Sequence, residues 1–134
     1  MRVRADDACP CGRERRYEQC CGPLHDGSRR AQTAEQLMRS RYSAFAAARP
    51  DYLGRTLHPA SRATFSLDAT REWIERTRWT CLSIIERTGG GPLDMRGTVR
   101  FDAHYVEDST FRTHHENSLF EKRHNIWYYV RPLD

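Results

Sequence analysis

The stretch GTVRFDAHY, residues 97–105, alternates between apolar and polar side chains. The apolar members are Val99, Phe101, Ala103 and Tyr105, and the polar members are Arg100, Asp102 and His104. Successive side chains of a β-strand point to opposite faces of a sheet. The pattern therefore predicts a strand that buries one face and exposes the other to water.

Further strands are predicted on both sides of this stretch, because the neighbouring segments are rich in β-branched and aromatic residues. The expected strands are residues 79–87, 97–105, 111–122 and 126–131. The expected connections are the loop GGGP at 89–92 and turns at 107–110 and 123–125. Short connections join antiparallel neighbours, so the second half of the chain predicts a four-stranded meander.

The first half of the chain predicts helices. Thr33 and Gln36 have the spacing of a capping box, and apolar residues then recur at helical spacing as far as Arg49. The expected helices are residues 33–49, 51–57 and 68–77, the third capped by Asp68 with Trp73 and Ile74 facing inward. Helices followed by a meander are typical of an α+β domain whose helices pack on one sheet face.

Length and composition fit a chain that buries a core of its own. At 134 residues the chain has the size of one ordinary domain. It contains no apolar run near 18 residues, so we expect no membrane span. The residues MRVRADDACP at 1–10 lack the apolar region of a secretory signal, so we expect a cytoplasmic location.

The formal net charge of +4 invites a nucleic-acid interpretation, which the composition weakens without excluding it. The basic residues are arginines except for Lys122, a skew that genome composition explains as well as phosphate binding does. Acidic residues are interspersed among them. Four thiolates around one dication would also lower the formal charge from +4 to +2.

Cysteines cluster near the N-terminus in the segment C9-P-C-G-R-E-R-R-Y-E-Q-C-C21. A reducing cytosol favours free thiols, and one residue between Cys9 and Cys11 strains a disulfide. A tight turn containing Pro10 and Gly12 can aim two thiolates at one point. A short helix over residues 14–19 would bring the second pair back toward the first. Four thiolates are a usual structural zinc set, so we expect Zn²⁺ bound by Cys9, Cys11, Cys20 and Cys21.

Two adjacent cysteines are awkward ligands, because neighbouring side chains on a helix diverge by about 100°. Cys20 and Cys21 can share an ion only if the helix ends there, and we expect Gly22-Pro23 to end it. His25 is the alternative fourth ligand if Cys21 turns away. Cys81 lies in the apolar run WTCLSII and is expected to fill the core as a small hydrophobic residue.

The segment CPCGRERRYEQCCG, residues 9–22, resembles the SEC-C motif of the SecA translocase tail, in which eight residues separate a C-x-C pair from C-C or C-H. Other segments resemble the bacterial YchJ-like family, which joins a SEC-C motif to a nuclear-transport-factor-2-like (NTF2-like) domain. These segments are CCGPLH at 20–25, TAEQLMRSRYSAF at 33–45, DYL at 51–53, HP at 58–59, GTVRF at 97–101, HENS at 115–118 and WYYV at 127–130.

The resemblance implies a zinc knuckle over residues 1–25 and a cone-shaped α+β domain over 26–134, with about three helices on a curved four-stranded antiparallel sheet. Residues 22–32 are interpreted as a linker. One departure is visible: Arg13 and Glu14 replace the Ser-Gly that follows the first cysteine pair in many SEC-C motifs.

A cone of this kind can enclose a pocket between helix and sheet. The candidate pocket residues are Arg41, Tyr42, His58 and Glu116, with His104 and His115 as further candidates. We expect Glu116 and Arg41 to form a buried ion pair, because burying either charge alone is costly. His114 and Glu116 share a strand face, but two ligands are too few for a second metal site. No residue is assigned a catalytic role.

Two functions follow from these features. The first is a binding module, in which the knuckle presents Arg13, Arg15 and Arg16 to an acidic partner; the SEC-C resemblance implies partners in protein export or at the ribosome. The second is a small-molecule receptor or enzyme that uses a pocket around Arg41, His58 and Glu116, which rests on analogy with the fold.

Overall fold

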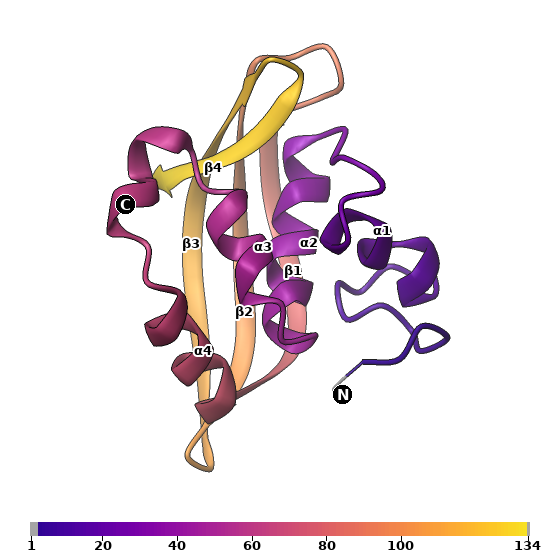
Figure 1. Ribbon diagram of the computed structural model, residues 1–134, viewed down its shortest axis with the longest axis vertical. Helices are drawn as coiled ribbons and strands as arrows, with labels where there is room; N and C mark the ends of the chain where they lie inside the picture. The colour runs from indigo at the N-terminus through magenta and orange to yellow at the C-terminus, as the bar shows by residue number, and fades with distance from the viewer. Residues whose placement is uncertain (1–2, 134) are drawn as a thin grey trace.

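A four-stranded antiparallel sheet forms one layer of the protein, in the order β1-β2-β3-β4. The computed structural model describes residues 3–133. The strands are β1 (Thr77–Gly89), β2 (Arg96–Glu107), β3 (Thr110–Arg123) and β4 (Ile126–Pro132). The helices gather on one face of the sheet, and the N-terminal segment packs beside them (Figure 1). The α+β architecture predicted from the sequence is confirmed.

Tight turns connect the last three strands, as expected. Asp108 and Ser109 join β2 to β3 with φ angles of 49° and 68°, and His124 and Asn125 join β3 to β4 with 52° and 66°. Two successive residues with positive φ are the mark of a type I′ hairpin turn, whose twist matches that of the flanking strands. The meander is therefore built from sequence-local hairpins.

The helices precede the sheet in the chain. They are α2 (Ala34–Ala46), α3 (Pro50–Arg55), a 3₁₀ helix η2 (Pro59–Thr64) and α4 (Leu67–Arg76). Thr33 caps α2 as predicted, because its hydroxyl accepts a hydrogen bond from the backbone nitrogen of Gln36 at 3.0 Å. Gln36 reaches back one residue further than expected, to the nitrogen of Gln32 at 2.6 Å. Ser66, rather than Asp68, caps α4.

The core lies between α2 and the inner face of the sheet. Leu37 from α2 packs in one buried cluster with Val99 of β2, Phe120 of β3 and Trp127 of β4. These side chains lie on the apolar face of their helix or strand, so burying them removes a continuous apolar surface from water. Ile74 of α4 joins the same cluster, as its helical position predicts.

The prediction for Cys81 is wrong: its side chain is exposed. The register of β1 against β2 shifts between Trp79 and Cys81, where a β-bulge interrupts the alternation. Trp79, Leu82 and Ile84 pack against the core, so the extra residue moves Cys81 to the outer face. One inserted residue reverses the facing of the side chains that follow it, here as far as the second register shift between Ile84 and Glu86.

The N-terminal segment also differs from expectation. Only Cys20 separates a 3₁₀ helix η1 (Tyr17–Gln19) from α1 (Cys21–His25), so Gly22-Pro23 lies inside a helix and does not end one. Pro23 is tolerated because it sits in the first turn, where its missing N–H has no helical partner. The expected linker at 22–32 is thus helical at its start. Among residues 3–133, no helix has the length and apolar character needed to cross a bilayer.

Candidate metal centre

The first cysteine pair lies on a tight turn. The backbone nitrogen of Gly12 donates to the carbonyl oxygen of Cys9 at 3.3 Å, and Gly12 has a φ of 92°, which disfavours residues with a side chain. An isolated antiparallel bridge between Ala8 and Arg16 closes the loop. The turn therefore holds Cys9 and Cys11 on one side of a small backbone loop.

The second pair lies at a break between two helices. Cys20 follows η1 and precedes α1, with a non-helical backbone of φ −125° and ψ −100°. This break turns the side chain of Cys20 away from the direction it would take on a continuous helix. The two adjacent sulfurs can therefore face one point, although the helix ends before Cys21 and not after it as expected.

The four cysteines converge. Their Sγ atoms all lie within 4.8 Å of one another, and those of Cys11 and Cys20 are 3.6 Å apart. A tetrahedral site with metal–sulfur bonds of about 2.3 Å places its sulfurs about 3.8 Å apart. Cys9, Cys11 and Cys21 are buried, and Cys20 is half-buried. The cluster has the composition, spacing and enclosure to hold a metal ion.

The thiols interact strongly enough to separate their pKa values. Hydrogen bonds from Cys21 and Cys9 lower the pKa of Cys11 to about 2, despite its burial. The bond to Cys11 raises the pKa of Cys9 to about 12, and the same neighbour raises the pKa of Cys21. Four negative charges this close repel one another, so a bound cation is what would allow all four to ionise.

His25 does not belong to the cluster. It is fully buried, and its Nε2 donates to the carbonyl oxygen of Ser40 on α2 at 2.8 Å. Its Nδ1 then accepts the hydroxyl of Tyr17 at 2.5 Å. Both ring nitrogens are occupied, so of the two alternatives for the fourth ligand the geometry favours Cys21.

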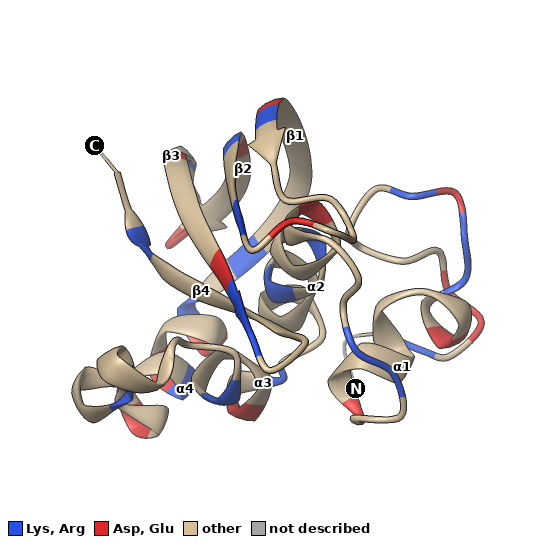
Figure 2. Ribbon diagram, turned by 90° about the horizontal axis from the view of Figure 1, so that it is seen from above, with Lys and Arg blue, Asp and Glu red and all other residues tan. Residues whose placement is uncertain are grey.

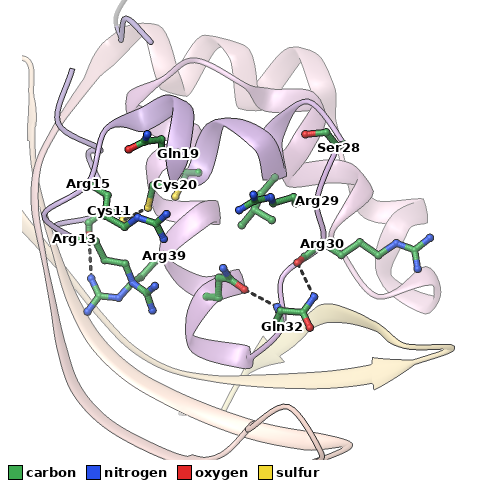
Figure 3. Close-up of a pocket in the computed structure, with 14 residues that line it drawn as sticks. Cys11, Arg13, Arg15, Gln19, Cys20, Ser28, Arg29, Arg30, Gln32 and Arg39 are labelled. Atoms are coloured by element: carbon green, nitrogen blue, oxygen red, sulfur yellow. Dashed lines mark hydrogen bonds between the residues drawn. The ribbon is translucent and has the colours of Figure 1, made fainter. Parts of the chain in front are cut away.

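A basic groove runs beside the metal centre, with a volume of about 590 Å³. Its basic lining residues are Arg13, Arg15, Arg29, Arg30 and Arg39. Arg13, Arg15 and Arg39 gather next to Cys11, Arg29 stands across from them and Arg30 extends outward (Figure 3). Basic positions follow the chain around α1 in the view from above (Figure 2). No acidic residue is among those that line the groove.

The sequence pointed to part of this groove. Arg13 and Arg15 were expected on the knuckle surface, but Arg16 lies outside the groove and pairs with Glu18 at 3.6 Å. Arg29, Arg30 and Arg39 were missed, because the first two fall in the expected linker and the third on a helix 28 residues from Cys11. The spacing of Glu35 and Arg39 is that of an ion pair along a helix, and it carries no signal of a contact with Cys11.

A second cavity lies between α2 and the sheet. Arg41, Tyr42 and Glu116 line it, as expected, together with His114. His58 does not: its Nδ1 accepts the nitrogen of Ala60 at 3.1 Å and caps η2. The ring of His58 is therefore oriented by a helix end outside the cavity.

The expected ion pair between Arg41 and Glu116 does not form. Arg41 donates from Nη1 to the carbonyl oxygen of Leu53 at 2.9 Å and to Thr56 at 2.6 Å. Its guanidinium lies over the ring of Tyr129, 4.7 Å from the centroid, and the hydroxyl of Tyr129 donates to Glu116 at 2.6 Å. Tyr129 thus lies between the two charges and contacts both.

The remaining histidines follow the pleat of the sheet. His114 and Glu116 lie on the inner side and are joined by a 2.8 Å hydrogen bond. His104 and His115 lie on the outer side, where His104 contacts Thr113 and His115 contacts Asp102. Within residues 3–133, the cysteine cluster is the one group of three or more residues with metal-ligand spacing.

Comparison with protein families finds two matches along the chain. Residues 33–132 match the model described as YchJ, middle NTF2-like domain, and residues 7–23 match the SEC-C motif. A UPF0225 protein of Geobacter sulfurreducens is 46% identical over 122 residues, covering 91% of this chain and 76% of that protein. A UPF0225 protein of Streptomyces coelicolor is 44% identical and covers 91% of each.

Two solved structures share the fold. The solution structure of a SEC-C motif containing protein from Rhodopseudomonas palustris has a TM-score of 0.85 and 36% identity, covering 94% of this chain and 97% of that one. The crystal structure of a SEC-C motif containing protein from Psychrobacter arcticus has a TM-score of 0.83 and 32% identity, covering 96% and 83%.

Proposed function

The chain belongs to the YchJ-like family with a SEC-C motif and an NTF2-like domain, and we propose that it binds one zinc ion and presents the basic groove beside that ion to an acidic protein segment. Ribosomal or protein-translocation components with acidic segments are partners of the kind this groove suits. The cytoplasmic location and the division of the chain after residue 25 stay predictions.

Zinc is the metal that the donor set favours. Four thiolates in tetrahedral spacing suit Zn²⁺, and a closed four-sulfur set is typical of structural rather than catalytic zinc. Iron accepts the same ligands, but zinc needs no redox partner and no cluster assembly. With Cys9, Cys11, Cys20 and Cys21 all engaged, the ion would stabilise the loop and leave no open position for a substrate.

The basic groove is the observation that carries the binding proposal. Arg39 pairs with Glu35, with Nε and Oε2 2.8 Å apart, and Glu35 also pairs with Arg87. The other basic residues of the groove are exposed and make no ion pair within residues 3–133: Arg13, Arg15, Arg29 and Arg30. Unpaired cations of one sign lining a concavity raise the local concentration of anionic partners. The metal centre would fix the loop that carries Arg13 and Arg15.

The lining favours a protein partner over single-stranded nucleic acid. The groove contains arginines, the amides of Gln19, Gln32 and Gln36, and no aromatic ring. Proteins that bind single strands usually add aromatic platforms on which bases stack. Guanidinium and amide groups alone suit the carboxylates of Asp and Glu side chains, which accept bidentate hydrogen bonds.

Fluorescence anisotropy with a labelled oligoglutamate peptide tests this proposal. A quadruple variant with Gln at positions 13, 15, 29 and 30 removes the unpaired charges of the groove. The matched control carries the same change at exposed arginines elsewhere: Arg71, Arg78, Arg123 and Arg131. We expect zinc-loaded wild type and the control to bind the peptide, and the groove variant to lose affinity at least tenfold.

Two outcomes would refute the proposal. Equal losses in the groove variant and the control would show that net charge, not the groove, attracts the peptide. Tighter binding of an oligouridylate of equal charge than of the peptide would point to a nucleic-acid site. A salt series separates screening from specific contacts, because exposed charge pairs weaken over a Debye length of about 8 Å at physiological ionic strength.

A further inference from the structure

The cavity between α2 and the sheet is mostly apolar and has a volume of about 210 Å³. Its walls include Phe45, Trp73, Trp79 and Phe101. The ring centroids of Phe45 and Trp79 are 5.0 Å apart, and those of Trp73 and Trp79 are 5.3 Å apart. These rings pack against one another at a tilt and edge to face, and together they present an aromatic lining that suits an apolar ring. The volume is below the usual range for drug-sized ligands, so it fits a molecule with one ring.

Arg41 adds a positive charge to the lining of this cavity. Its Nη1 is held by Leu53 and Thr56, and no carboxylate of residues 3–133 pairs with it. Described buried polar side-chain atoms all have a hydrogen-bond partner, so the remaining Arg41 donors reach accessible space, and Arg41 lines the cavity. Burial lowers the pKa of Arg41 to about 10, which leaves it charged at neutral pH.

Glu116 does not supply the missing counter-charge. Its two oxygens accept from His114 at 2.8 Å, from Ser118 at 2.5 Å and from Tyr129 at 2.6 Å. Burial opposes its ionisation, but these hydrogen bonds prevail and lower its pKa to about 2. Its charge is therefore held by its own donors, with the ring of Tyr129 between it and Arg41.

A cation with unused donors among the aromatic side chains of a small cavity is complementary to one class of small molecule. We propose that this cavity binds a small planar aromatic carboxylate, with the carboxylate on Arg41 and the ring between Trp79 and Phe101. Guanidinium and carboxylate make charge-assisted, geometrically matched hydrogen bonds, and the ring is removed from water against aromatic side chains. This site is separate from the metal centre and from the basic groove.

Benzoate and benzamide form a matched pair of probes, because they share a ring and a shape but only benzoate carries a negative charge. Trp73 and Trp79 line the cavity, so quenching of tryptophan fluorescence reports binding, and amide chemical-shift mapping locates it. We expect benzoate to perturb the signals of the cavity residues and benzamide to bind at least tenfold more weakly, since a hydrogen bond to a charged group is lost.

Arg41→Met should lower benzoate affinity by about tenfold to a hundredfold while leaving benzamide affinity unchanged. Arg71→Met, at an exposed arginine of α4, is the control and should change neither. Ala103→Leu fills part of the cavity and should abolish binding of both benzoate and benzamide. If Arg41→Met does not fold, the affinities of wild type for benzoate and benzamide still test whether the cavity selects a carboxylate. Equal binding of both probes, or shifts confined to residues outside the cavity, would overturn the proposal.

Discussion

Arg39 on α2 donates a hydrogen bond from Nη1 to the carbonyl oxygen of Cys11, across a distance of 2.7 Å. The same guanidinium donates from Nε to Glu35 at 2.8 Å, and Glu35 also pairs with Arg87 of β1. One chain of polar contacts thus runs from the cysteine turn through α2 to the sheet. The loop that carries Cys9 and Cys11 is therefore held against the domain by a side chain of α2.

Replacing Arg39 tests this connection. Arg39→Met removes a charge-assisted hydrogen bond to the turn, so we expect the free energy of unfolding to fall by about 1.5–3 kcal/mol. Metal should also leave faster when a chelator is added, because the cysteine turn opens more often. Denaturant unfolding and stopped-flow chelation measure the two effects. Arg71→Met, an exposed arginine paired with Asp68, should change neither, and equal behaviour of both variants would contradict the connection.

The four clustered cysteines should be protected from thiol reagents by a bound metal, whereas Cys81 should react. With metal bound, we expect one zinc per chain and one thiol that reacts rapidly with Ellman's reagent, namely Cys81, because its side chain is exposed on β1. Denaturation with a chelator should release the other four cysteines. Elemental analysis and a timed thiol assay make the measurement.

Single substitutions separate ligands from bystanders. Cys20→Ser should lower metal retention during dialysis against chelator, because serine is a poor zinc ligand beside three thiolates. Cys81→Ser should keep one zinc per chain and lose the fast-reacting thiol. Full metal content in Cys20→Ser would argue against a four-thiolate site.

His25 should make stability depend on pH. Burial, the largest cause, lowers its pKa from 6.5 to about 4 in the folded protein. Between these values the unfolded chain binds more protons than the folded one, so the free energy of unfolding falls as the pH falls. The contribution is complete above pH 6.5 and is lost toward pH 4. From pH 7 to pH 5 we expect a loss of about 2 kcal/mol from this residue.

His25→Gln isolates that contribution, because it keeps all four metal-ligand candidates and removes the titrating ring. Its stability should fall less than that of wild type between pH 7 and pH 5, while acid effects on the metal centre remain common to both. Imidazole nitrogen shifts give a direct check. A ring signal from His25 that titrates near pH 6.5 would show that the ring is not buried in its neutral form.

A close approach of two glycines fixes the loop before β2. A Cβ on Gly97 would lie 2.4 Å from the Cα of Gly90, and Gly90 also accepts the first helical N–H of α2, from Ala34 at 2.9 Å. Gly97→Ala should therefore cost at least about 1 kcal/mol, since the backbone must move. Gly91→Ala meets only the flexible side chain of Asp94, at 3.3 Å, and should be nearly neutral. Thermal unfolding of both variants measures the difference, and equal melting temperatures would contradict the close approach of Gly97 and Gly90.

Local patterns in the sequence were sufficient for much of the fold. The capping pair Thr33 and Gln36 marked the start of α2, and the alternation from Val99 to Tyr105 identified β2. The turns expected at 107–110 and 123–125 are present, and Asp108, Ser109, His124 and Asn125 adopt positive φ there. Each of these features depends on neighbours within a few residues, where backbone sterics and side-chain period act directly.

Features whose position depends on a shift of one or two residues along the chain could not be predicted from local patterns. A bulge between Trp79 and Cys81 placed Cys81 outside the core, although its segment is apolar. The helix break lies at Cys20, two residues before the Gly22-Pro23 pair that was expected to end the helix. The positions of the bulge and of the helix break depend on tertiary contacts. The secondary-structure propensities of the neighbouring residues do not encode those contacts.

The sequence by itself determined which four thiols are available to hold a metal ion, because Cys9, Cys11, Cys20 and Cys21 are close neighbours along the chain. The sequence also determined that helices precede strands, because the side-chain periods of a helix and of a strand are both set by residues close together in the chain. Only the tertiary structure decided that Arg39 supports the cysteine turn, that His25 faces Ser40 and that Tyr129 lies between Arg41 and Glu116. Those pairings join distant segments, and packing of the whole core selects them.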